Sequence, residues 1–452
     1  MHESKNISRR RFVSSAAVLS LPLLLSNAAF ANSGNNVLRH ACIGVGGMGG
    51  YDLQNFKQHA DVKIVALCDT DAAILKKAAE MFPDARTYSD WREMFNKEQN
   101  NIDSVNVSVP DHNHFIIAIN AIRLGKHVYC QKPMCHDVAE VRALTKAAVK
   151  KGVVTQLGTQ HASGKGDRTA VQWIRQGLIG KIKHVYLCSN RSGIEGYRLE
   201  GPRPQENTPV PETLNWEVWT GTAPMRSYAP GIYHPAKWRT WQDFGTGWSG
   251  DIGCHIFDAV WKGMNLKAPL SVTAEVQASW QNSAARRADT WPQGDHITWI
   301  FPGNEFTAGN TVQVEWFDGA YYPPADVQAL YKSKYPEEGA MLIGTEGALL
   351  IPHTEMPVLL PEEKFKDEQL PELENRNHYH HFVDACLKRA QNESYFAQTG
   401  PMTEAILLGT IAIRVPNTLL EWDAAEMRFS NHAEANQYLK RKYRKGWEVK
   451  DF

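Results

Sequence analysis

Ala41-Cys42-Ile43-Gly44-Val45-Gly46-Gly47-Met48-Gly49-Gly50 is the stretch that decides the fold. Its apolar start is typical of a short buried strand, and the spacing Gly44-x-Gly46-x-x-Gly49 follows directly. In such a loop the first glycine turns the chain tightly, the second admits a pyrophosphate, and the third lets the next helix pack on the sheet. The stretch predicts a dinucleotide site at a helix N-terminus, contacted by Gly44, Gly46, Gly47, Met48 and Gly49.

A second apolar segment, Val62–Cys68, ends at Asp69, about twenty-five residues after Gly44. An acidic residue at this spacing binds the ribose hydroxyls of a dinucleotide, which favours NAD over NADP. Thr70 and its neighbours leave NADP open as an alternative. A second interpretation of Asp69 is that it only caps the helix expected over 71–81.

Strand and helix patterns alternate from Arg39 to about Gln160, which predicts a parallel sheet with helices on both faces. From Ile182 to about Ile351, apolar runs are separated by loops rich in Gly and Pro, which indicates a largely antiparallel open sheet. A chain of 452 residues exceeds a single core. We therefore expect an α/β Rossmann domain over 32–160 and an α+β domain over 161–452.

The chain ends with helical patterns over Tyr379–Ala390 and Thr403–Val415. A basic tail follows at Lys440–Lys445, which we interpret as a solvated helix face. Basic and acidic residues balance at 49 each, so the composition does not indicate nucleic acid as a partner. The seven cysteines form no C-x-x-C motif and predict buried free thiols.

The first thirty or so residues differ in kind from the rest. Ser8-Arg9-Arg10-Arg11-Phe12 precedes the apolar run Ala16–Leu25, which is too short for a bilayer span, and Ala29-Phe30-Ala31 offers a cleavage site. This pattern predicts a twin-arginine export signal over 1–31, and a periplasmic mature protein without a membrane span. An uncleaved anchor or a chance basic N-terminus are the alternatives.

Lys132 stands in Gln131-Lys132-Pro133, at the carboxyl end of the expected strand His127–Cys130. Ligands bind at these strand ends in open α/β sheets, and the proline holds the lysine at a fixed point. The alternative is a surface lysine beside a turn proline.

Asp251 and His255 are neighbours on one face of an expected helix, because they are four residues apart. A carboxylate in that place holds an imidazole in one tautomer and stabilises its charged form. The alternative is a helix cap at Asp251 with a core histidine beside it.

Pro110-Asp111-His112-Asn113-His114 follows another strand. We expect Pro110, His112 and His114 to line the cofactor cleft, or Asn113 to cap the next helix. A metal site is not predicted here, nor at His378, His380 and His381, where a partly exposed helix start is expected.

Together these motifs resemble the glucose–fructose oxidoreductase / inositol dehydrogenase family (Gfo/Idh/MocA). The late segments Leu419-Leu420-Glu421-Trp422-Asp423 and Tyr443-Arg444-x-Gly446-Trp447 are similar to its exported bacterial branch. By this resemblance, Lys132, Asp251 and His255 are the catalytic residues. Gln131 departs from the pattern, since the family commonly has Glu before Lys-Pro. The glutamine removes a negative charge near Lys132 and the nicotinamide end of the cofactor.

The resemblance implies hydride transfer between tightly bound NAD(P) and a secondary hydroxyl of a sugar or glycoside, such as C3. His255 would take the hydroxyl proton, Lys132 would stabilise the charge that develops on the oxygen, and Asp251 would orient His255 or bind a neighbouring hydroxyl. Arg191, Trp238 and Arg239 are further substrate candidates, with Tyr197 beside them. The tryptophans of Lys237-Trp238-Arg239-Thr240-Trp241 are alternatively core residues.

Two rival functions remain at this stage. Some relatives are NAD-dependent glycosidases, in which transient oxidation at C3 acidifies the C2 proton and permits elimination. A non-catalytic sugar-binding protein is the other rival. By analogy with the family, the second domain supports a homo-oligomer, either a dimer or a tetramer.

Overall fold

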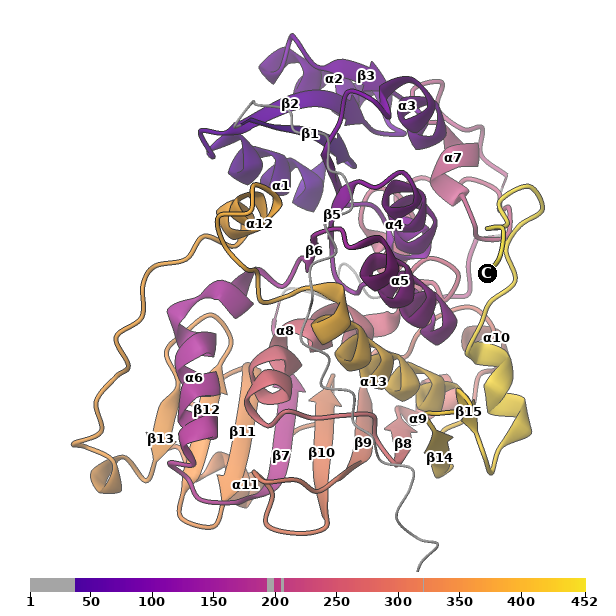
Figure 1. The fold of residues 1–452 in the computed structure, drawn as a ribbon. Coiled ribbons are helices and arrows are strands. Elements are labelled where there is room, and N and C mark those ends of the chain that lie inside the picture. Colours follow the sequence, from indigo (N-terminus) through magenta and orange to yellow (C-terminus); the bar gives the residue numbers. More distant parts are fainter. Residues whose placement is uncertain (1–36, 193–198, 205–206, 320) are drawn as a thin grey trace, which may run out of the picture. The chain divides into compact units, whose positions relative to one another are not determined.

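Two β-sheets organise the chain (Figure 1). The computed structural model describes residues 37–192, 199–204, 207–319 and 321–452. The predicted export signal, 1–31, and Tyr197 lie outside these residues.

The first sheet has six parallel strands in the order β3-β2-β1-β4-β5-β6. Its strands are β1 (Leu38–Ile43), β2 (Val62–Cys68), β3 (Arg86–Tyr88), β4 (Ser104–Val107), β5 (His127–Cys130) and β6 (Thr155–Leu157). Its helices are α1 (Gly47–Lys57), α2 (Ala72–Met81), α3 (Trp91–Glu98), α4 (His114–Arg123) and α5 (Val138–Lys151). The strand order reverses between β1 and β4, which is the switch point where α/β sheets bind ligands. The predicted Rossmann sheet is confirmed.

The second sheet has nine strands in the order β13-β12-β11-β7-β10-β9-β8-β14-β15. They are β7 (Ile182–Ser189), β8 (Ser271–Val276), β9 (Asp295–Pro302), β10 (Thr311–Asp318), β11 (Glu338–Gly344), β12 (Ala348–Pro352), β13 (Val358–Leu360), β14 (Leu420–Asp423) and β15 (Arg428–Phe429). Neighbouring strands are antiparallel except β7 and β10, which run parallel. The expected, largely antiparallel sheet is therefore also confirmed.

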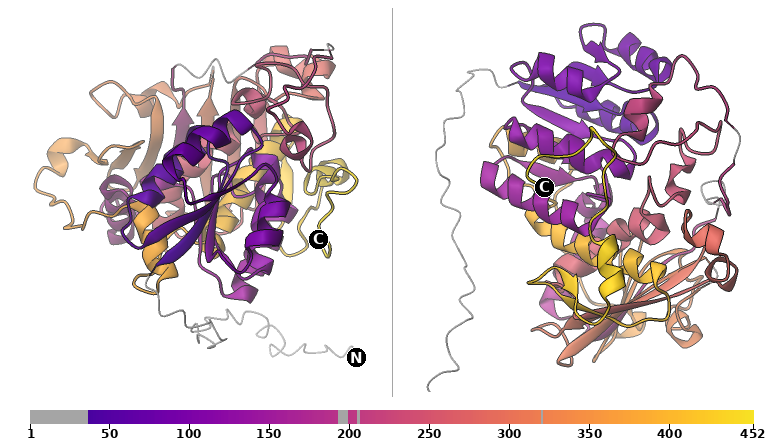
Figure 2. Two further views of the ribbon diagram at one scale, coloured as in Figure 1. Left: turned by 90° about the horizontal axis from the view of Figure 1, so that it is seen from above. Right: turned by 90° about the vertical axis from the view of Figure 1, so that its right-hand side faces the viewer.

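Long helices form a layer between the two sheets (Figure 2). The remaining helices of the chain are α6 (Lys165–Gln176), α7 (Trp216–Thr220), α8 (Gly247–Gly263), α9 (Ala278–Gln281), α10 (Ala284–Arg287), α11 (Ala325–Gln328), α12 (His378–Cys386) and α13 (Phe396–Arg414). Helix α13 contacts α5 of the first sheet, α8, and strands β8 and β9 of the second. One continuous apolar core therefore extends from the Rossmann sheet to the second sheet.

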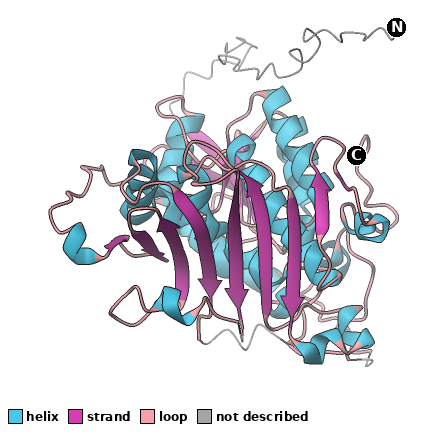
Figure 3. Cartoon of the chain, turned by 90° about the horizontal axis from the view of Figure 1, so that it is seen from below, coloured by secondary structure: helices cyan, strands magenta, loops and turns pink. Residues whose placement is uncertain are grey.

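In the described part of the chain, no layer of long helices covers the opposite face of the second sheet (Figure 3). Open faces of antiparallel sheets occur because one face is enough to bury the core residues. None of the helices in the described part of the chain has the length and apolar character of a membrane span. All seven cysteines are free and buried, as predicted.

Three features of the C-terminal part differ from the sequence predictions. Helix α13 begins at Phe396, two turns before the predicted start, and continues through Pro401. Helix α12 returns to the first sheet, where Tyr379 and Phe382 join a core cluster with Phe56 of α1. The tail 440–445 is not a helix.

The solvated-face prediction for the tail is wrong for Arg441. Its guanidinium lies 2.8 Å from Glu140 and 3.6 Å from Asp137 and donates to the carbonyl oxygen of His112. Because two buried carboxylates need compensation, this part of the basic tail is bound to the protein instead of facing solvent.

Candidate active site

The glycine loop packs closely between β1, β4 and helix α1. Gly44 has φ +80°, and a Cβ placed there would lie 2.2 Å from the carbonyl oxygen of Ser108. A Cβ on Gly49 would lie 2.2 Å from the carbonyl oxygen of Gly44. Helix α1 begins with no side-chain cap and no acidic residue in its first turn, while Gly47 and Met48 are exposed. The free N–H groups and the close backbone packing fit the pyrophosphate of a dinucleotide.

Asp69 lies against this loop at the end of β2. Its carboxylate accepts hydrogen bonds from the backbone N–H groups of Val45 and Asp71, each at 2.9 Å. The capping role falls to Asp71 instead, whose side chain accepts from Ala73 and Ile74 at the start of α2. Asp69 is thereby held at the place where a ribose of a bound dinucleotide would lie.

The histidines of the 110–114 segment do not face a ligand, which corrects the prediction for His112 and His114. The two nitrogens of His112 contact the carbonyl oxygens of Phe244 and Trp219, at 3.3 and 2.9 Å. Those of His114 contact the carbonyl oxygens of Pro133 and Val109, both at 2.7 Å. Both rings are buried, so they join loops of the site to one another.

Two further residues of this segment have their own environments. Pro110 is partly exposed at the start of the short 3₁₀ turn 111–113, and its place in the cofactor cleft stays a prediction. Asn113 does not cap α4 with its side chain, because its amide group donates to the carbonyl oxygen of Trp219 at 3.0 Å.

Lys132 and Asp251 meet at the centre of the site. The Lys132 Nζ lies 3.0 Å from Asp251 Oδ1, and the Arg239 Nε lies 3.2 Å from the same oxygen. Burial alone would raise the pKa of Asp251, but the two cations lower it to about 2. Asp251 is therefore ionised at neutral pH, and the ammonium of Lys132 is held at the carboxyl end of β5.

His255 lies one turn beyond Asp251 on α8, as its spacing predicted. The expected contact between Asp251 and His255 does not form. The Asp251 carboxylate contacts Lys132 and Arg239 instead. The Nδ1 of His255 is buried and has no hydrogen-bond partner among the described residues. Burial, followed by the charge of Lys132, holds the pKa of His255 well below its usual range. The ring is therefore neutral and able to accept a proton.

The sequence candidates for substrate binding separate into two groups. Trp238 is a core residue, which was the alternative interpretation, because it is buried in an aromatic cluster with Trp216, Trp219 and Trp241. It also packs against Arg239, whose guanidinium lies 4.2 Å from the centroid of the Trp238 ring. Arg191 lies 5.5 Å from the ring centroid of Trp248, a residue that the sequence reasoning did not select.

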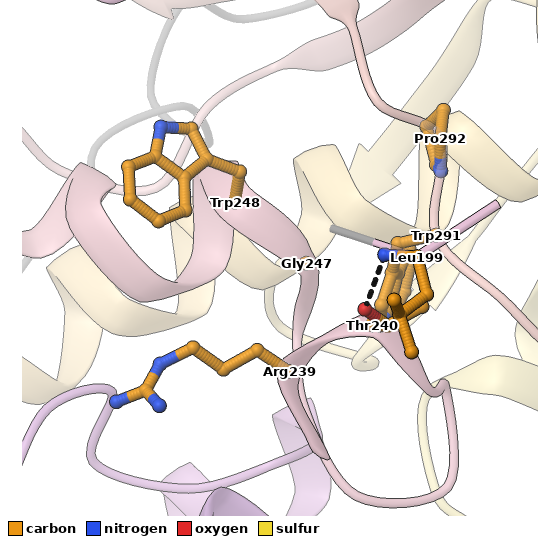
Figure 4. A pocket seen from close by; sticks show the side chains of 7 residues that line it. All are labelled: Leu199, Arg239, Thr240, Gly247, Trp248, Trp291 and Pro292. Carbon is orange, nitrogen blue, oxygen red and sulfur yellow. Dashed lines mark hydrogen bonds between the residues drawn. The ribbon is translucent and has the colours of Figure 1, made fainter. Parts of the chain in front are cut away.

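A pocket adjoins Arg239 (Figure 4). Its lining residues are Leu199, Arg239, Thr240, Gly247, Trp248, Trp291 and Pro292. In Figure 4 the side chains of Trp248 and Arg239 extend to the same side, while those of Thr240 and Trp291 lie on the other. An aromatic ring beside a guanidinium offers both an apolar face and hydrogen-bond donors, which is a combination that suits a sugar ring.

Two acidic residues of the site, Asp52 and Asp111, were not selected from the sequence, although Asp111 stands within the 110–114 segment. Asp52 of α1 contacts the side chain of Gln131. Asp111 accepts hydrogen bonds from the backbone N–H and the hydroxyl of Thr246, at 3.1 and 2.9 Å, directly before helix α8. Burial, together with the nearby charge of Asp251, raises the pKa of Asp111 to about 7.

Two histidines, His161 and His353, were missed as well. Their rings adjoin that of His255. Within the described ranges, no group of three or more His, Cys, Asp or Glu side chains is arranged as a metal site.

Comparison with known proteins places this geometry in a family. Residues 38–159 match the model of an oxidoreductase family with an NAD-binding Rossmann fold, GFO_IDH_MocA. Residues 168–323 match the C-terminal alpha/beta domain of the same family. The two models together cover more than half of the chain.

Individual proteins of known name match only part of this chain, at 30% identity or less. A glycosyl hydrolase family 109 protein from Stenotrophomonas maltophilia is 30% identical over 246 residues, which cover 52% of this chain and 50% of that protein. A levoglucosan dehydrogenase from Pseudarthrobacter phenanthrenivorans is 30% identical over 120 residues, which cover 26% of this chain and 30% of that protein. The chain thus spans half or less of the curated relatives that it matches.

Solved structures share the fold over most of the chain. The WlbA dehydrogenase from Bordetella pertussis, solved with NADH and UDP-GlcNAcA, has a TM-score of 0.59 at 16% identity, covering 86% of this chain and 99% of that one. At this identity the likeness shows the fold alone. On its two matching domains and its NAD-binding Rossmann sheet, the chain belongs to the Gfo/Idh/MocA oxidoreductase family.

Proposed function

We propose that this protein is an NAD(P)-dependent oxidoreductase that transfers hydride between a tightly bound nicotinamide cofactor and a secondary hydroxyl of a sugar or glycoside. One observation carries the proposal: Lys132 Nζ lies 3.0 Å from Asp251 Oδ1 at the end of β5, with His255 on the next turn of α8. An ammonium ion and a neutral imidazole at a strand end are the groups that alcohol oxidation needs.

Each residue of the site has a separate role in the proposed hydride transfer. When bound, NAD supplies the hydride acceptor, with its pyrophosphate at the glycine loop and a ribose at Asp69. His255 accepts the proton of the substrate hydroxyl. Lys132 donates a hydrogen bond to the same oxygen and stabilises its developing negative charge. Asp251 holds the ammonium in place and, with Arg239, is available to a neighbouring hydroxyl.

A second candidate is an NAD-dependent glycosidase that oxidises the sugar transiently and eliminates its leaving group. One observation favours it as an alternative. Curated relatives are named as glycosyl hydrolase family 109 proteins, and one from Shewanella oneidensis is named an alpha-N-acetylgalactosaminidase. A non-catalytic sugar-binding role is disfavoured, because it has no need for Lys132, Asp251 and His255 together.

We also propose that the protein is exported in folded form to the periplasm and works as a homo-oligomer. The support for export is the Arg9-Arg10 motif and the apolar run that follows it. The support for an oligomer is the open face of the second sheet (Figure 3). Since a periplasm should supply little free nucleotide, an exported enzyme must carry NAD(P) with it and restore it within each cycle.

One experiment distinguishes the candidates. The purified protein is incubated with sugars and aryl glycosides while absorbance at the reduced-nicotinamide band and aglycone release are recorded together. Lasting reduction with a keto product supports the oxidoreductase. Aglycone release without lasting reduction and without a keto product contradicts it and favours the glycosidase. Absence of both signals, with Lys132→Ala changing only ligand binding, favours the sugar-binding role.

A further inference from the structure

Three histidine rings form a triangle at the edge of the candidate active site. The ring centroids of His255 and His353 are 5.4 Å apart, those of His353 and His161 are 4.8 Å apart, and those of His161 and His255 are 6.0 Å apart. No direct hydrogen bond joins these three described rings, but at such separations one water molecule can bridge two imidazole nitrogens. The rings come from helix α8, the end of β12 and the 3₁₀ turn 160–163.

The triangle leads from the reacting centre to solvent. His255 is partly buried, with a fully buried Nδ1, and lies next to Lys132 in the charge cluster of the site. His353 is also partly buried, whereas His161 is exposed. Exposure to solvent is thus greatest at His161, the outermost of the three imidazoles.

The charges around the three rings favour outward movement. His255 is close to Lys132, His353 is close to Arg191 and Lys132, and His161 has Glu338 nearby. Burial, followed by His161 and then by Arg191 and Lys132, lowers the pKa of His353 to about 3. Burial also lowers the pKa of His161, but Glu338 opposes this shift. Positive charge therefore lies nearest the inner rings, whereas the charged group near the outer ring is Glu338, which also pairs with Arg191 at 3.6 Å.

We propose that His353 and His161 form a relay that carries the substrate's hydroxyl proton from His255 to solvent. This inference rests on the proposed oxidation. Per alcohol oxidised, one hydride goes to the nicotinamide and one proton goes to His255, as the O–H bond breaks and an N–H bond forms. In each relay step one N–H bond breaks as the next forms, and His161 releases the proton to water or buffer. The carbonyl reduction runs the same steps inward.

The first test uses buffer rescue and proton release. In weakly buffered solution, His161→Asn and His353→Asn should slow steady-state turnover, with roughly a hundredfold as the scale of a lost proton-transfer group. Imidazole added at high concentration should restore most of this loss. In the first turnover, nicotinamide absorbance should rise at the wild-type rate while release of the proton to a pH indicator lags behind it. The matched control is His432→Asn, a helix-cap histidine of the C-terminal segment, which should behave as wild type.

A second readout needs no redox substrate. With the histidine rings labelled with ¹⁵N, exchange of the His255 ring proton with water should slow in His161→Asn and stay unchanged in His432→Asn. If no sugar reduced the nucleotide, the proposed function would be contradicted. The exchange rate of the His255 ring proton would still show whether His161 and His353 carry protons to solvent. Unchanged ring-proton exchange, or proton release that stays synchronous with absorbance in both variants, would overturn the relay. A stoichiometric metal ion lost in His353→Asn would overturn it too.

Discussion

The side-chain amide of Gln131 donates hydrogen bonds to both carboxylate oxygens of Asp52, at 3.0 and 2.9 Å. Ser108 and Tyr379 donate their hydroxyl groups to the same carboxylate, at 2.6 and 2.7 Å. Burial raises the pKa of Asp52 to about 6, against the effect of these three donors. The departure from the family's Glu before Lys-Pro now has a physical reason, because a carboxylate already occupies the space that residue 131 faces.

Restoring glutamate at this position should therefore destabilise the protein. In Gln131→Glu two carboxylates would meet in a buried site without a donor between them. We expect a loss of roughly 3 kcal/mol in the free energy of unfolding, on the scale of an uncompensated buried charge. Urea unfolding at neutral pH measures it.

The double variant Asp52→Asn with Gln131→Glu is the matched control for that prediction. It exchanges the amide and the carboxylate, and it should recover at least half of the lost stability. An additive double variant, or a stable single variant, would show that the contact between the two side chains is not what selects glutamine here.

Gly49→Ala should weaken nucleotide binding. The added Cβ would lie 2.2 Å from the carbonyl oxygen of Gly44, so the glycine loop must shift. Overpacking of this kind costs about 1–3 kcal/mol, which corresponds to a rise of roughly fivefold to 150-fold in the dissociation constant of NAD, measured by calorimetry. In Gly309→Ala the nearest atom is at 3.4 Å, an ordinary contact, so NAD affinity should not change. If Gly49→Ala bound NAD as tightly as the wild type does, the nucleotide would not bind at the glycine loop.

Asp111 should give the stability a distinctive pH dependence. Its pKa is raised from 3.8 to about 7 in the folded protein, so it binds a proton more tightly there than in the unfolded chain. The stability that it contributes is complete below about pH 4 and is lost as the pH rises to about 7. The free-energy curve of Asp111→Asn should therefore fall less steeply across this window than that of the wild type.

Chemical unfolding at several pH values within that window tests the slope. Asp326→Asn, at an exposed carboxylate of α11, should run parallel to the wild type. A parallel curve for Asp111→Asn would mean that Asp111 stays ionised in the folded protein throughout.

Local signals in the sequence predicted much of the fold and the centre of the site. The glycine spacing after β1 and the strand end before Lys132 each depend on a few consecutive residues. Asp251 and His255 could be placed on one helix because their spacing is helical. Helix α13 was predicted too short because Gly400 and Pro401 are strong helix breakers in an isolated sequence. In the structure most residues of α13 are buried, and this burial outweighs the cost of the two breakers.

Contacts between distant segments could not be predicted. Gln131 and Asp52 are far apart in the chain, and so are His161 and His353. No periodicity links them, so only the packing of the sheets and helices brings them together. For His112 and His114 the residue type was misleading. Histidine suggested a ligand site, but the ring nitrogens of both residues contact backbone carbonyl oxygens of the protein itself. Asp251 likewise pairs with Lys132 and Arg239, which lie outside α8, and not with His255 on its own helix.

The most direct test of the account is a single-turnover measurement at the reduced-nicotinamide band. Nucleotide-loaded wild type and Lys132→Ala are each mixed rapidly with a panel of sugars and aryl glycosides. With at least one substrate, absorbance in the wild type should rise, lastingly or transiently, and at least about a hundredfold faster than in Lys132→Ala carrying the same amount of nucleotide. Equal rates in the two proteins, or glycoside cleavage by the wild type without any absorbance change, would contradict hydride transfer at the Lys132–Asp251–His255 site.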